Sequence, residues 1–131
     1  MTIAVVFLSV LSLASLSVWD GVYSEEQAKR GEAIYYARCG ACHGSEQDGG
    51  DMTPALKGGV FTSTWNQLSV GDLFERIRVT MPLDSPSTLS RQQTADVTAF
   101  LLSANGWPAG GTELPRDTEP LREIQIEAMK P

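Results

Sequence analysis

The stretch Cys39-Gly40-Ala41-Cys42-His43 holds both cysteines and the one histidine of this 131-residue sequence. A structural zinc site needs four ligands, and this stretch offers only three, at a spacing that is unusual for zinc. A redox-active dithiol places its C-x-x-C at the start of a helix in a β-α-β unit, whereas here the pair follows a predicted helix. A disulfide between Cys39 and Cys42 would close a tight, strained loop.

The same spacing is typical of covalent haem attachment. Two thiols three positions apart can each add to one haem vinyl group and form a thioether, and the next residue brings an imidazole under the iron. We therefore predict one covalent haem c per chain, held by Cys39 and Cys42, with His43 as the proximal iron ligand. The other ring nitrogen of His43 needs a hydrogen-bond acceptor that orients the ring.

Methionine is the expected second iron ligand because the sequence has no second histidine. A Met/His pair suits electron transfer. Met52 follows His43 after only a short loop, and Met129 lies in the C-terminal tail. Met81 is far enough along the chain to pass round a haem edge, and Pro82 holds its backbone extended. We predict Met81 as the ligand; the alternative is that it is a core residue at the end of an amphipathic helix.

Helical periodicity dominates the chain, and no stretch sustains the alternation typical of strands. The fold class is therefore all-α. The first helix is predicted to start at Ser24, where Gln27 completes a capping box, and to run into the Cys39 motif. A second helix is predicted over residues 70–80.

A third helix opens at Ser90, where Gln93 completes a second capping box, and ends at Asn105-Gly106. Residues 44–59 are rich in glycine and polar side chains and are expected to form a loop. A short turn is expected at residues 61–65. Three apolar residues of the tail, Leu121, Ile124 and Ile126, are expected to anchor it.

The chain divides into three predicted segments. Residues 1–17 read as a secretory signal peptide, with the mature chain beginning near Val18 and residing in the periplasm. The alternative is an uncleaved membrane anchor, but the apolar stretch is short for a span. Residues 18–107 form the predicted domain, and residues 108–131 a C-terminal extension that wraps its surface.

The net charge of −6 limits the partners. An acidic surface disfavours nucleic acids and anionic membranes, and it favours a redox protein with a basic docking patch. No stable membrane span is expected.

Three motifs together resemble class I cytochrome c. They are Cys39-Gly-Ala-Cys42-His43-Gly44, then Thr53-Pro54-Ala-Leu56-Lys-Gly58, then Thr80-Met81-Pro82. The resemblance covers roughly residues 24–107. It implies that the first and last helices cross around one haem, with Gly31 and Tyr35 meeting Phe100. It also implies that the Pro54 carbonyl accepts the His43 ring N–H.

Residues 73–110 are similar to cytochromes of bacterial pyrroloquinoline-quinone alcohol dehydrogenases, which accept electrons from the quinone. Similar domains accompany other dehydrogenases and terminal oxidases. Trp65, Arg76 and Arg78 are candidates to bind the haem propionates, and the alternative for both arginines is a solvated helix face.

The predicted function is that of a mono-haem single-electron carrier without enzymatic activity, in a periplasmic respiratory or dehydrogenase chain. One competing hypothesis is a haem enzyme or gas sensor, which needs an open sixth iron position. The other is a thiol oxidoreductase, which needs free thiols.

Overall fold

The computed structural model describes residues 16–131, which are mainly helical. The helices are α1 (Glu25–Arg38), α2 (Gly40–His43), α3 (Gly59–Trp65), α4 (Val70–Thr80), α5 (Arg91–Ala104) and α6 (Thr118–Arg122). A 3₁₀ turn spans Val18–Asp20, and the short strands β1 (Leu16–Ser17) and β2 (Ile124–Gln125) pair in parallel. This composition confirms the all-α class. Within the described residues, no helix has the length and apolar character needed to cross a membrane.

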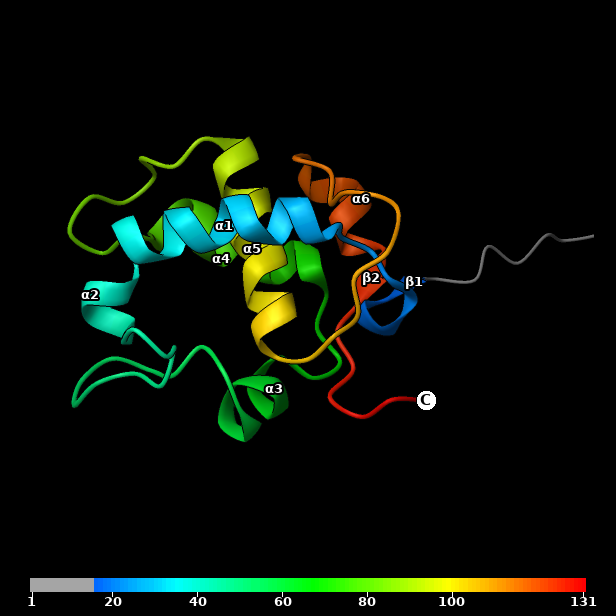
Figure 1. Ribbon diagram of the computed structural model, residues 1–131, viewed down its shortest axis with the longest axis horizontal. Coiled ribbons are helices and arrows are strands. Elements are labelled where there is room, and N and C mark those ends of the chain that lie inside the picture. Colours follow the sequence, from blue (N-terminus) through cyan, green and yellow to red (C-terminus); the bar gives the residue numbers. More distant parts are fainter. Residues whose placement is uncertain (1–15) are drawn as a thin grey trace, which may run out of the picture.

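The core is built around the crossing of α1 and α5 (Figure 1). Gly31 lies at the crossing, where a Cβ atom would come within 1.8 Å of the Asp96 carbonyl oxygen. Beside it, the rings of Tyr35 and Phe100 pack with their centroids 5.3 Å apart. The crossing that the resemblance implied is therefore confirmed, including the contacts of Gly31 and Tyr35 with Phe100.

Helix ends follow local sequence signals in most places. α4 has the predicted bounds, and a capping box at Ser69 that was not predicted starts it. Ser90 and Gln93 form the predicted box at α5, and the helix ends before Asn105 as expected. Residues 61–65, predicted to form a turn, belong to the longer helix α3, which begins at residue 59 inside the predicted loop.

The capping box predicted at α1 was half wrong. Ser24 does cap the helix, since its hydroxyl accepts the Gln27 N–H. The Gln27 side chain, however, points into the fully buried interior. There its Nε2 donates to the Leu114 carbonyl at 3.0 Å, and its Oε1 accepts the Leu114 N–H at 2.7 Å. Gln27 thus pairs with the backbone of a distant segment because that backbone would otherwise be buried without partners.

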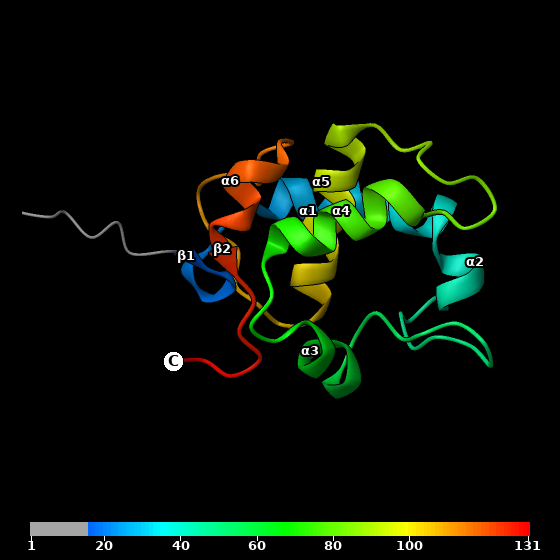
Figure 2. The ribbon, with the colours of Figure 1, turned by 180° about the vertical axis from the view of Figure 1, so that it is seen from behind.

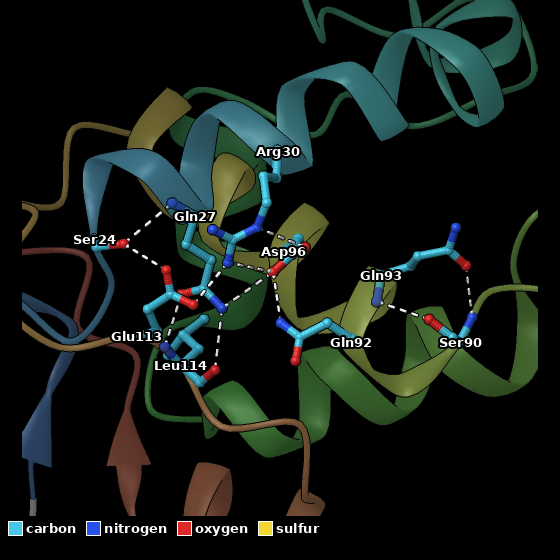
Figure 3. A network of polar contacts seen from close by, with 9 residues as sticks. All are labelled: Ser24, Gln27, Arg30, Ser90, Gln92, Gln93, Asp96, Glu113 and Leu114. Atoms are coloured by element: carbon cyan, nitrogen blue, oxygen red, sulfur yellow. Dashed lines mark hydrogen bonds and ion pairs between the residues drawn. The ribbon is translucent and has the colours of Figure 1, made fainter.

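A polar network joins α1, α5 and the extension (Figure 3). Arg30 of α1 pairs with Asp96 of α5 at 3.2 Å and with Glu113 of the extension at 2.7 Å. The Asp96 side chain also accepts a bond from Gln92 at 2.9 Å. These polar contacts join α1, α5 and the extension in addition to the apolar contacts of the aromatic rings.

The C-terminal extension contributes to the same core as the rest of the chain. Four of its side chains are buried there: Leu114, Leu121, Ile124 and Ile126. The indole N–H groups of Trp19 and Trp107 both donate to the Glu127 carbonyl, at 2.9 and 3.1 Å. The boundary at residues 107 and 108 stays a prediction. Of the predicted signal peptide, residues 1–15 lie outside the described residues, and Leu16–Ser17 form β1.

The two ends of α1 carry different parts of the molecule. α6, β1 and β2 lie at its amino-terminal end, and α2 lies at its carboxyl-terminal end (Figures 1 and 2). The loop after α2 and helix α3 run along one side of the crossed helices (Figure 1). The extension is therefore kept away from the Cys39 motif.

Candidate functional site

The two cysteines lie on a single helical turn. Cys39 ends α1, where its N–H donates to the Tyr35 carbonyl at 2.8 Å, and it also precedes the first residue of α2. The N–H of Cys42 returns to the Cys39 carbonyl at 3.2 Å. Residues three apart on such a turn share a face. Both thiols are free, with Cys39 half-buried and Cys42 exposed, as addition to two neighbouring vinyl groups requires.

Burial makes Cys39 a poor nucleophile. It raises the pKa of the Cys39 thiol to about 11, so the thiolate is scarce at neutral pH. Thiol oxidoreductases rely instead on a thiolate whose pKa is lowered. The environment of Cys39 therefore disfavours the thiol oxidoreductase hypothesis.

The imidazole of His43 is buried and held in one orientation. Its Nδ1 lies 2.9 Å from the Pro54 carbonyl oxygen. A carbonyl can only accept, so Nδ1 carries the proton and Nε2 keeps its lone pair for a metal. The loop returns to the motif because the Gly49 N–H donates to the His43 carbonyl at 2.7 Å. The structure thus brings together His43 and Pro54.

Tyr35 holds the backbone just after the motif, which the sequence analysis missed. Its hydroxyl donates to the Gly44 carbonyl at 2.5 Å, and its ring is fully buried. Burial raises the pKa of Tyr35 to about 12, so the hydroxyl remains a donor at neutral pH. A tyrosine on the core face of the helix leading into the motif was the available signal.

Met81 follows α4 in an extended conformation, with φ −114° and ψ 157°. This is the conformation predicted from Pro82. Its side chain is half-buried and packs against the core, whereas Met52 and Met129 are 95% and 82% exposed. Among residues 16–131, Met81 is thus the methionine held in place by its surroundings.

The three candidates for propionate contacts differ in what they already bind. Arg78 is paired with Glu75 through two hydrogen bonds, at 2.9 and 2.8 Å, which fits the alternative of a helix-face residue. Arg76 is exposed on α4. Trp65 packs against Phe61, with ring centroids 6.3 Å apart. Within the described residues its indole N–H has no protein acceptor, unlike those of the other two tryptophans.

The chemistry of this donor set fits a haem. One imidazole nitrogen is free to bind iron, two thiols share a face, and the thioether of Met81, just after α4, packs against the core. The segment between the motif and Met81 also exposes apolar side chains, namely Met52, Val60, Leu68 and Val79, with Leu83 just beyond it. A large apolar macrocycle would remove such surface from water.

Crossed helices with a C-x-x-C-H turn at one end define a c-type cytochrome. A family model described as "Cytochrome C oxidase, cbb3-type, subunit III" matches residues 26–101. That match spans more than half of the chain, and the chain belongs to this family. It is a class I mono-haem c-type cytochrome with covalently bound haem c, and its domain is one that transfers electrons.

Two further comparisons complete the findings. The search of curated proteins found no match. A chain in the crystal structure of the sulfane dehydrogenase SoxCD from Paracoccus pantotrophus is similar, with 24% identity and a TM-score of 0.57. The alignment covers 82% of this chain and 61% of that chain. At this identity the likeness shows the fold alone.

Proposed function

We propose that this cytochrome is a single-electron carrier, without catalysis of its own, in a periplasmic respiratory or dehydrogenase chain. Cys39 and Cys42 anchor the haem, and His43 and Met81 ligate its iron. When bound, the haem iron changes between the ferric and ferrous states and so carries one electron. The observation that carries this proposal is the fixed His43 imidazole together with Met81, the one core-packed methionine of residues 16–131.

The residues of the chain perform two tasks in this proposal. The Pro54 carbonyl holds the His43 proton on Nδ1 and thereby makes Nε2 the iron ligand. The Met81 thioether would hold the haem iron as a soft, neutral ligand, which would favour ferrous iron and leave no coordination position open. A closed position suits an electron carrier rather than an enzyme or gas sensor. Trp65 is proposed to donate its free indole N–H to a propionate.

The partner is proposed to be a redox protein, either a dehydrogenase or a terminal oxidase. The match to a chain of a sulfane dehydrogenase makes a dehydrogenase complex a reasonable setting, and the family name points to an oxidase. The comparisons give no support to the finer likeness to pyrroloquinoline-quinone enzymes. Export through the uncharged amino-terminal segment is the proposed route to the periplasm, and cell fractionation tests it.

Replacing Met81 with alanine tests the ligand set. The haem should remain covalently attached and resist extraction by acid and acetone, because attachment depends on Cys39 and Cys42. The oxidised variant should lose its weak sulfur-to-iron charge-transfer band, its potential should fall, and the reduced variant should bind carbon monoxide. Met52→Ala is the matched control and should keep the band. Loss of the band in Met52→Ala alone would show that Met52 is the ligand.

A further inference from the structure

The last residue of α1, Arg38, reaches across to the loop that follows Met81. Its Nη2 donates to the Thr88 hydroxyl at 2.6 Å and lies 3.4 Å from the Ser85 hydroxyl. The Thr88 hydroxyl itself donates a hydrogen bond to the Ser85 carbonyl at 2.7 Å. The guanidinium thus binds a small turn whose hydrogen bonds are already arranged to receive it.

The Arg38 contact connects the loop over residues 82–89 to α1, the helix that leads into the Cys39 motif. Its other hydrogen bonds stay local: the Ser85 N–H donates to the Pro82 carbonyl and the Ser87 hydroxyl to the Val79 carbonyl, both at 3.0 Å. Within residues 16–131, the hydrogen bonds that join residues 82–89 to a helix other than the preceding α4 are those of Arg38. The loop passes the carboxyl end of α1 in both views (Figures 1 and 2).

We propose that Arg38 is a positioning residue for Met81. It immediately precedes Cys39, so it is fixed to the side of the molecule that anchors the haem, and it holds the loop that begins just after the Met81 thioether. The proposal rests on Met81 as the iron ligand. Arg38 does not touch the iron; it restricts the loop that would have to move for Met81 to dissociate.

The size of the effect follows from the kind of contact. A charge-assisted hydrogen bond at an exposed position changes an equilibrium constant by about fivefold. That is small against the stability of a folded domain but large enough to change how often a single ligand dissociates. Loss of Arg38 should therefore leave the protein folded, but Met81 should dissociate from the iron more often.

Imidazole binding to the ferric holoprotein measures this directly, because imidazole must displace Met81. We expect Arg38→Ala to lower the apparent Kd for imidazole about fivefold. Arg38→Lys keeps the charge, and its Kd should lie between those of Arg38→Ala and the wild type. Lys29→Ala is the matched control, since it removes an equal charge from the exposed face of the same helix. Its imidazole affinity should equal that of the wild type.

A second variant separates the hydrogen bond from the charge. Thr88→Val removes the acceptor without changing any charge. It also removes the bond from the Thr88 hydroxyl to the Ser85 carbonyl, so it should lower the Kd at least as much as Arg38→Ala does. Adding Arg38→Ala to Thr88→Val should lower the Kd no further. Wild-type affinity in Arg38→Ala, or effects that simply add in the double variant, would overturn the positioning role.

The Met81→Ala variant separates failure of this proposal from failure of the ligand set. It should bind imidazole more tightly than every other variant, because nothing competes for the iron. If it binds no more tightly than the wild type, Met81 is not the ligand and both proposals fail. If it does bind more tightly and Arg38→Ala does not, only the role of Arg38 fails.

Discussion

Gly31 shows how one residue can decide whether two helices meet. Its missing Cβ lets the backbone of α5 approach α1, because a side-chain atom there would overlap the Asp96 carbonyl. The neighbouring contacts then depend on that approach. They are the aromatic pair of Tyr35 with Phe100 and the ion pair of Arg30 with Asp96, each of which joins α1 to α5.

Replacing Gly31 with alanine should therefore destabilise the holoprotein by at least about 2 kcal/mol, because the two backbones must separate. The measurement is denaturant unfolding followed by circular dichroism. Gly59→Ala is the control: its Cβ would meet nothing within 4 Å, so its stability should stay within about 0.5 kcal/mol of wild type. Equal unfolding midpoints for the two variants would show that the crossing has room to adapt.

The sequence predicts those residues whose role depends on their neighbours in the chain. Cys39, Cys42 and His43 form a contiguous motif whose chemistry depends on spacing alone, and the half-buried Met81 sits beside a proline that sets its backbone. Gln27 and Arg38 are different, because their partners lie in distant segments of the chain. Local spacing contains no information on such contacts, so only the fold reveals them.

Helices also divide into those that local sequence predicts and those that it does not. α4 and α5 begin at strong local signals, a serine followed three residues later by a side chain that bonds back to it, and α5 ends at Asn105-Gly106. The sequence predicts only a turn at α3, because the N-cap of this helix, Gly58, offers no side-chain oxygen. α6 is short and was not predicted at all; its one buried side chain, Leu121, packs in the common core and supports it.

The contact between α4 and α6 should make stability depend on pH. Glu75 accepts hydrogen bonds from Arg78 on its own helix and from Thr118 at the start of α6. These bonds, with that from Arg78 first, lower the pKa of the Glu75 carboxyl to about 2. Since the unfolded chain has the ordinary, higher pKa, the stabilisation is complete above about pH 4.5 and is lost as the pH falls towards 2.

Glu75→Gln should therefore cost about 1 kcal/mol at neutral pH and progressively less between pH 4.5 and pH 2. Thermal unfolding of both proteins across this range measures the difference. Glu123→Gln is the control, because it removes an equal charge from an exposed side chain of the C-terminal extension and should change the stability at neutral pH by less than about 0.5 kcal/mol. A Glu75→Gln deficit that stays unchanged down to pH 2 would contradict the role of the carboxylate.

In the whole molecule, the packing of the C-terminal extension and the haem motif lie at different ends of α1. The extension is fastened by Gln27 (Figure 3), by the two indoles on Glu127 and by buried aliphatic side chains. Its elements α6 and β2 lie at the amino-terminal end of α1 (Figure 1). The haem motif, the loop over residues 44–58 and the loop after Met81 lie towards the other end. Packing at one end can therefore hold α1, α4 and α5 while the other remains open to a partner.

Charge at that open end should control electron transfer. The loop over residues 44–58 exposes Glu46, Asp48 and Asp51 against a single Lys57, and Asp84 follows Met81. With a net charge of −6, the ferrous protein should attract a cationic oxidant and repel an anionic one. The screening length falls from about 30 Å at 0.01 M salt to about 8 Å at 0.15 M, so added salt should weaken both effects.

Stopped-flow oxidation by two small complexes of opposite charge tests this without knowledge of the natural partner. The rate with tris(phenanthroline)cobalt(III) should fall as ionic strength rises, and the rate with ferricyanide should rise. Asp48→Asn should flatten both slopes more than Glu123→Gln does, because each removes one charge and Glu123 lies on the extension, away from the haem motif. Rates independent of salt for both complexes would mean that electrons leave through a surface on which these carboxylates have no influence.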